Sequence, residues 1–127
     1  MRKPLHVLFC LGLALLVATP LAAGEKKLLH CFAFTVIDNA SAADWQAFAK
    51  ATDGLPSKIP GLTRVWQGKL RQPLSAGGPP RQHGVCMEMN DEATFKTYGT
   101  HPAHTAWADA YSKVRQPGTT TFQILGQ

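Results

Sequence analysis

Residues 28–37 are almost continuously apolar, with frequent β-branched and aromatic residues and no helix breaker. This pattern predicts a first strand. One face carries His30, Phe32, Phe34 and Val36, and the other carries Leu29, Cys31, Ala33 and Ile37. Both faces are largely apolar, whereas a half-buried strand has polar residues on one side. We therefore expect both faces of this strand to be covered.

A helix is predicted next, with Ser41 as its N-cap and Asp44 three residues later in the capping-box position. Its apolar positions recur at helical spacing and include Trp45, Phe48, Ala49 and Thr52. Pro56 and the turn at 59–61 end the helix.

Two further strands are predicted around a long loop. Residues 62–71 alternate, with Leu62, Arg64 and Trp66 on one side and Thr63, Val65 and Gln67 on the other. Residues 73–80 contain three prolines and two glycines, which predicts an irregular loop of a wide hairpin. Residues 82–89 predict the third strand, with His83, Val85, Met87 and Met89 on one face.

The C-terminal third predicts two helices and a strand. A short helix is capped by Asp91 and extends to Tyr98. Pro102 suits the first position of the next helix, because the missing N–H of proline would have no partner there. This helix is predicted from Pro102 to about Val114, and 119–125 predict the last strand.

The order strand, helix, strand, strand, helix, strand predicts an α+β, ferredoxin-like βαββαβ sandwich with both helices on one face of an antiparallel sheet. The bare face of this sheet then needs a partner. A two-fold homodimer covers it most simply, with the two sheets closing into an α/β barrel.

The first 23 residues predict a cleavable signal peptide. Arg2 and Lys3 precede an apolar run at 7–18, and small residues follow, so that cleavage after Ala23 or Gly24 fits equally. A membrane-spanning helix needs about 20 apolar residues, which is longer than this run. We expect an exported protein, periplasmic or secreted, that is soluble and not held by the membrane after cleavage.

Without this segment, 104 of the 127 residues remain, enough for one hydrophobic core and one domain at 28–125. The formal net charge of +5 falls to +3 when Arg2 and Lys3 are lost, too little to indicate nucleic-acid binding. Cys31 and Cys86 could form a disulfide outside the cytoplasm or remain buried thiols. Their spacing is not that of a metal site.

Candidate chemistry is concentrated between Tyr98 and His104. Helical spacing places His104 on one face with Trp107 and Tyr111, so we expect these side chains to line an interior pocket. A tyrosine and a histidine in one apolar pocket are suited to general acid–base chemistry. The alternative is that each is an ordinary hydrogen-bonded core residue.

His30 and His83 lie among the large apolar side chains of the first and third strands. On each strand, the face that carries the histidine is expected to meet the helices. Three imidazoles, with His104, are therefore predicted to approach one interior region. For either strand histidine alone, a structural role is the commoner interpretation.

Several segments together resemble the stress-responsive A/B barrel domain family. They are Leu-Leu-His30-Cys-Phe, Ile59-Pro60-Gly61, His83-Gly84 and Tyr98-x-x-His101-Pro102-x-His104. The resemblance covers about residues 28–125 and implies a dimeric ferredoxin-like barrel. At these positions the chain is most similar to the olivetolic acid cyclase type of polyketide cyclase within that family. That similarity implies that His104 acts as a base, that Tyr98 orients a carbonyl, and that His30 and His83 line the cavity.

Three functions remain open from the sequence. The favoured one is a homodimer that binds a small apolar or carbonyl-containing ligand without turnover, since a fold does not determine a function. The second is a cyclase-like or other proton-transfer enzyme that uses His104 and Tyr98. The third is a metal site at His101 and His104, which no nearby carboxylate or cysteine completes.

No cofactor and no resident metal are expected. The aromatic residues Trp45, Phe48, Trp66 and Trp107 are explained by core packing, and the sequence contains neither CxxCH nor a glycine-rich phosphate loop.

Overall fold

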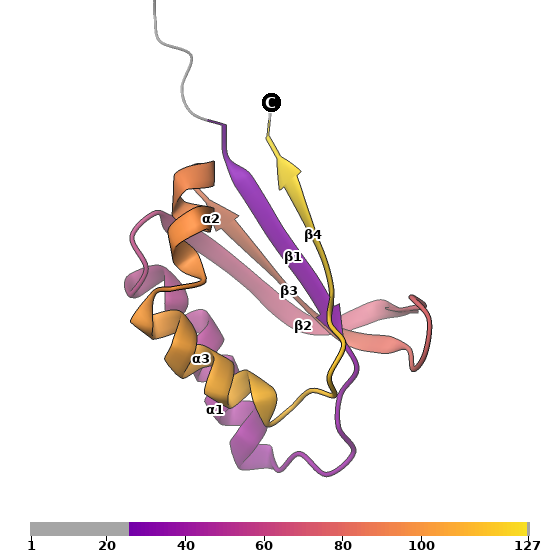
Figure 1. Ribbon diagram of the computed structural model, residues 1–127. Coiled ribbons are helices and arrows are strands. Elements are labelled where there is room, and N and C mark those ends of the chain that lie inside the picture. Colours follow the sequence, from indigo (N-terminus) through magenta and orange to yellow (C-terminus); the bar gives the residue numbers. More distant parts are fainter. Residues whose placement is uncertain (1–25, 127) are drawn as a thin grey trace, which may run out of the picture.

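The computed structural model describes residues 26–126. The predicted signal peptide therefore lies outside the described residues. The elements follow the predicted order (Figure 1). They are β1 (Leu28–Phe34), α1 (Ala42–Asp53), the short 3₁₀ helix η1 (Leu55–Ser57), β2 (Leu62–Leu74), β3 (Arg81–Met89), α2 (Glu92–Tyr98), α3 (Pro102–Ser112) and β4 (Thr120–Leu125). No helix in this part of the chain is long and apolar enough to cross a membrane.

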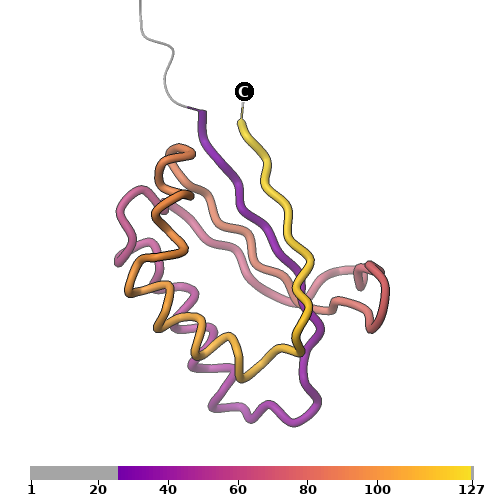
Figure 2. The backbone as a smooth tube through the Cα atoms, viewed as in Figure 1, coloured from indigo at the N-terminus to yellow at the C-terminus, as the bar shows by residue number. Residues whose placement is uncertain are grey.

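The four strands form one antiparallel sheet in the order β2-β3-β1-β4, and the helices lie along one of its faces (Figure 1). The two ends of the described chain lie side by side (Figure 2), where the Gly126 N–H donates to the Lys27 carbonyl at 2.7 Å. The predicted α+β, ferredoxin-like architecture is confirmed. We call the face of the sheet under the helices the inner face and the opposite one the outer face.

Both long helices begin where the sequence predicts. At α1, Ser41 Oγ accepts from the Asp44 N–H (3.1 Å) and Asp44 Oδ2 accepts from the Ser41 N–H (3.0 Å), which completes a capping box. At α3, Pro102 is the first helical residue, and His101 Nδ1 accepts from the Ala103 N–H at 3.1 Å.

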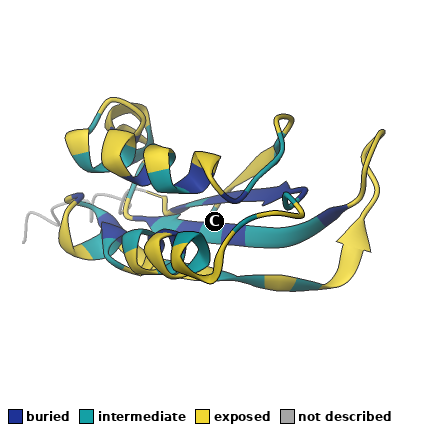
Figure 3. Cartoon of the chain, turned by 90° about the horizontal axis from the view of Figure 1, so that it is seen from below, coloured by how far each residue is buried: buried dark blue, intermediate teal, exposed yellow. Residues whose placement is uncertain are grey.

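The core lies between the inner face and the helices. Its largest fully buried side chains include Phe34, Phe48, Leu55, Val85, Met87, Met89 and Val114. The buried Thr52 joins two helices, since its Oγ1 accepts from Trp107 Nε1 (2.9 Å) and donates to the Phe48 carbonyl (2.7 Å). Figure 3 shows the buried positions along β1 and the exposed tip of the β2–β3 hairpin.

The first strand is shorter than predicted. It ends at Phe34, not at residue 37, because the next backbone groups bond outside the sheet ladder. The Thr35 carbonyl accepts from the Gln116 N–H at 2.8 Å, and the Val36 N–H donates to Gln82 Oε1 at 3.1 Å.

The expectation that Leu62 shares a side with Arg64 is wrong. Leu62 pairs with Met89 and is buried, whereas Arg64 pairs with Glu88 and is exposed. The register shifts between these two pairs, so the extra residue Thr63 moves the following positions to the other face.

The irregular loop is also shorter than predicted. β2 continues to Leu74, which pairs with Arg81 at the start of β3. Pro73 is tolerated because β2 is an edge strand, where its missing N–H costs no ladder bond.

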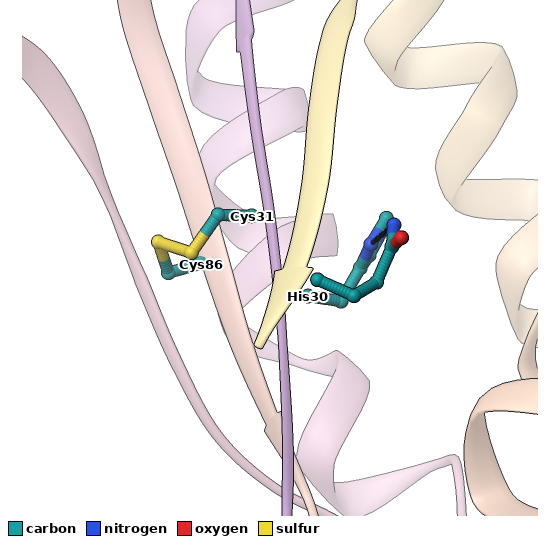
Figure 4. Close-up of a disulfide and its surroundings, with 4 residues drawn as sticks. His30, Cys31 and Cys86 are labelled. Atoms are coloured by element: carbon teal, nitrogen blue, oxygen red, sulfur yellow. Dashed lines mark hydrogen bonds between the residues drawn. A yellow bond between two sulfur atoms is a disulfide. The ribbon is translucent and has the colours of Figure 1, made fainter. Parts of the chain in front are cut away.

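The outer face carries a disulfide, where the sequence allowed either a disulfide or two buried thiols. Cys31 on β1 and Cys86 on β3 are direct register partners and are bonded to each other. Figure 4 shows this bond on one side of β1 and the His30 side chain on the other. The alternation of strand side chains separates them, because successive residues point to opposite faces.

Candidate functional site

A small pocket of about 170 Å³ lies between the inner face and helices α2 and α3. It is lined by His30, Phe32, Tyr98, His104, Trp107, Tyr111, Thr119 and Thr121. Most of these are aromatic rings, and none is acidic. The pocket is smaller than the roughly 300 Å³ at the lower end of drug-sized sites, so it suits a small molecule.

Tyr98 and His104 meet edge-on at this pocket, with ring centroids 4.5 Å apart. Tyr98 is the last residue of α2 and His104 lies in the first turn of α3, so the tight connection between the helices brings them together. His101 is the N-cap of α3 and Pro102 its first residue, so the helix begins at the point that brings His104 close to Tyr98.

His30 enters the same pocket from β1. Its ring lies 5.8 Å from that of Tyr98, and Gln123 Nε2 donates to its Nδ1 at 2.9 Å. An amide nitrogen only donates, so in this arrangement the ring proton of His30 is on Nε2. His30 therefore offers a donor on the side away from Gln123.

Burial sets the protonation of these groups. It lowers the pKa of His30, which the nearby His104 lowers further. Burial also lowers the pKa of His104, against a hydrogen bond to the Gly99 backbone that raises it. Burial and the neighbouring Tyr111 raise the pKa of Tyr98. At neutral pH the pocket thus holds neutral imidazoles, of which His104 can accept a proton, beside a phenol that can donate a hydrogen bond.

His83 does not join the other imidazoles, contrary to the expectation that three would meet. It packs at the other end of the core, 5.0 Å from Trp45 and 5.2 Å from Phe34 between ring centroids. Its register partner is Phe34, four residues along β1 from His30. At about 3.3 Å per strand residue, the two histidine positions are roughly 13 Å apart. Burial lowers the pKa of His83 as well.

The remaining candidate residues from the sequence lie at different positions in the structure. Trp107 and Tyr111 line the pocket, stacked with centroids 4.8 Å apart. His101 caps α3 through its Nδ1. Among residues 26–126, no three His, Cys, Asp or Glu side chains are grouped so as to hold a metal ion.

Several residues at the site carry no local signal in the sequence. Gln123 orients the His30 ring through its hydrogen bond to Nδ1. The hydroxyl groups of Thr119 and Tyr111 are hydrogen-bonded to each other at 2.8 Å. Both come from the last strand or the turn before it. Only its pairing with β1 brings this segment beside the pocket.

The outer face holds a second, larger hollow of about 510 Å³, over the disulfide. Its lining includes Cys31, Cys86, Trp66, Leu70, Leu74 and Phe122. Trp66, Leu74, Phe122 and the neighbouring Ile124 are large apolar side chains that remain exposed. Exposed apolar surface of this kind is typical of protein–protein interfaces and of ligand-binding grooves.

A protein-family model, the stress responsive A/B barrel domain (Dabb), matches residues 28–121. The chain belongs to this family. Among curated proteins, no sequence matches this Dabb domain.

Solved structures share the fold of this Dabb domain. A dimeric ferredoxin-like protein of unknown function from Thermobifida fusca is 22% identical, with a TM-score of 0.63 over 83% of this chain and 95% of that one. A Dabb family protein from Mesorhizobium loti is 23% identical, with a TM-score of 0.60 over 81% and 99%. The hydroxynitrile lyase from Passiflora edulis is 10% identical, with a TM-score of 0.66 over 81% and 95%. At such identities the likeness concerns the fold.

Proposed function

We propose that this Dabb domain binds a small, largely apolar molecule that carries a carbonyl group in the pocket at Tyr98 and His104. The observation that carries the proposal is the meeting of these two rings, 4.5 Å apart, in a pocket walled by aromatic side chains. Aromatic walls bind an apolar body, and the Tyr98 hydroxyl donates to the carbonyl oxygen.

Calorimetric titration with acetophenone tests this proposal. We expect saturable binding, and we expect Tyr98→Phe to weaken it about fivefold, the effect of one hydrogen bond. His101→Asn is the control, since asparagine preserves a helix N-cap outside the pocket. Binding that is absent, or that is unchanged in Tyr98→Phe, contradicts the proposal.

A second candidate is a proton-transfer enzyme at the same site. It is favoured by the neutral His104 imidazole beside a protonated phenol. His104 would take a proton from the carbon next to the carbonyl, and Tyr98 would donate to the oxygen of the resulting enolate. A protein of similar fold, the hydroxynitrile lyase from Passiflora edulis, is an enzyme.

This enzyme reaction can be followed in D₂O by NMR of a ketone that binds. His104 removes a proton, and the solvent returns a deuteron to the same carbon. We expect catalysed exchange that His104→Ala abolishes and His101→Asn retains. Exchange no faster than without protein would leave binding as the function.

We further propose that the outer face is covered by a second copy of this chain. The large exposed apolar side chains over β2 and β4 support it, as do the solved neighbours described as dimeric. Light scattering should give a dimer mass for the wild type. Trp66→Arg with Phe122→Arg should weaken association by at least about thirtyfold, as expected for central interface residues. A wild-type monomer mass at micromolar concentration overturns this proposal.

Export is proposed on two grounds. The N-terminal pattern is typical of a signal peptide, and a structural disulfide such as Cys31–Cys86 is typical of proteins in oxidising compartments. Mass spectrometry of the expressed full chain should find an N-terminus at residue 24 or 25. The absence of the protein from the exported fraction contradicts export, and an intact first residue in that fraction contradicts the predicted cleavage.

A further inference from the structure

One end of the pocket is backed by a positive charge. Arg115 stacks its guanidinium carbon 4.5 Å above the ring of Tyr111, and its Nη1 donates to Thr119 Oγ1 at 3.4 Å. Tyr111 and Thr119 both line the pocket and are hydrogen-bonded to each other at 2.8 Å. Arg115 therefore lies directly behind this part of the pocket wall.

A second guanidinium adds to this charge. Arg81 is only 9% exposed, and its hydrogen-bond partners are neutral oxygens. Its Nη1 donates to Thr35 Oγ1 at 3.0 Å and to the Pro79 carbonyl at 2.8 Å. Its Nε donates to Thr120 Oγ1 at 3.4 Å. These bonds hold the start of β3 against β1 and β4, so Arg81 is a structural residue. Its charge is nevertheless desolvated beside the pocket.

Both arginines act on the same wall residue. Burial raises the pKa of Tyr111, while its bond to Thr119 and the positive charges of Arg115 and Arg81 act in the opposite direction. The positive field of the two side chains thus reaches the Tyr111 hydroxyl.

No protein anion neutralises this charge in the described part of the chain. The two ion pairs there join Lys27 to Glu88 and Lys96 to Glu92. The Arg115 Nε is buried and has no hydrogen-bond partner among residues 26–126. A buried charged donor without a partner is costly, so a site of this kind gains from an anion.

We infer that the ligand of this pocket carries a carboxylate, bound at the Tyr111–Thr119 end and facing Arg115. This inference rests on the proposed function. The apolar body of the ligand then lies against Phe32 and Trp107, which line the pocket, and its other end reaches Tyr98 and His104. A hydroxyl of Tyr111 or Thr119 donates to the carboxylate, and the guanidinium behind them supplies the countercharge.

Benzoate and benzamide are matched probes, because they share size and shape and differ in charge. We expect calorimetry at low salt to show that benzoate binds about tenfold more tightly than benzamide, as a charge-assisted hydrogen bond provides. Arg115→Gln should remove this preference, measured as the ratio of the benzoate and benzamide affinities of that variant. Arg115→Lys, which retains the charge, should retain part of it.

Arg71→Gln is the control, since it makes the same charge change at an exposed position of the β2–β3 hairpin. Thermal unfolding of each variant verifies that it is folded. Equal binding of the two probes, or equal loss of the preference in Arg71→Gln and Arg115→Gln, overturns the inference and leaves the proposed function standing. If neither probe nor acetophenone binds, the proposed function fails, and the inference fails with it.

Discussion

The two faces of β1 are equally apolar in sequence but are covered in different ways. On the inner face, Phe32 and Phe34 are buried under helices of the same chain. On the outer face, Cys31 is joined to the adjacent strand, while the neighbouring Phe122 remains 50% exposed. An apolar strand face thus shows that cover is needed, and it does not show whether a helix, a covalent bond or another chain provides it.

The largest difference between the faces should be seen with matched phenylalanine substitutions. Phe34→Ala removes a side chain with no exposed area and should lower the free energy of unfolding by about 3–5 kcal/mol. Phe122→Ala, at a half-exposed position, should cost about 1 kcal/mol or less in the monomer. Urea denaturation of both variants at one low protein concentration measures the contrast, and equal losses would refute it.

Removing the disulfide tests how the outer face is held. Cys31 and Cys86 are 55 residues apart, so the bond restricts a long loop of the unfolded chain. Replacing both by alanine should lower the free energy of unfolding by about 2–4 kcal/mol. Dithiothreitol should destabilise the wild type by a similar amount and leave the double variant unaffected. A wild type that does not respond to the reductant, with both thiols then titratable, would contradict the expected stabilisation.

The smallest expected effect is a pH dependence of the free energy of unfolding that comes from His30 on the inner face. Burial lowers the pKa of His30 below its value of about 6.5 in the unfolded chain. The unfolded state then binds more protons between these two values, so stability falls as the pH decreases through that window. The limit is about 1.4 kcal/mol per pH unit for one histidine.

His83 and His104, whose pKa values burial also lowers, act in the same direction. Chemical denaturation at pH 7.5 and pH 5.5 should therefore show a smaller difference in His30→Gln than in the wild type. An identical pH difference in the two proteins would exclude this contribution of His30.

Much of the fold could be predicted because its signals are local. The capping box at Ser41 and Asp44 and the proline at 102 mark helix starts through neighbours in the sequence. The end of β1 at Phe34 could not be predicted, because it depends on Gln116, which is remote in sequence. The bulge at Thr63 likewise appears only when β2 is aligned with β3.

The candidate site divides in the same way. Tyr98 and His104 are six residues apart, and one tight connection brings their rings together, so the sequence was sufficient to pair them. His83 was expected beside them, and strand register places it at the other end of the core. Arg115 gave no local signal, because its position behind the pocket depends on the stacking with Tyr111.

The sequence by itself determined the order of the strands and helices along the chain and the residues at which the long helices begin, since these depend on residues within about one helical turn or two strand positions. Only the tertiary structure decided which residues face one another across the sheet: Cys31 with Cys86, and His30 with Gln123. The physical reason is that a strand takes its partners from distant parts of the chain. A shift of one residue in their register moves a side chain to the opposite face.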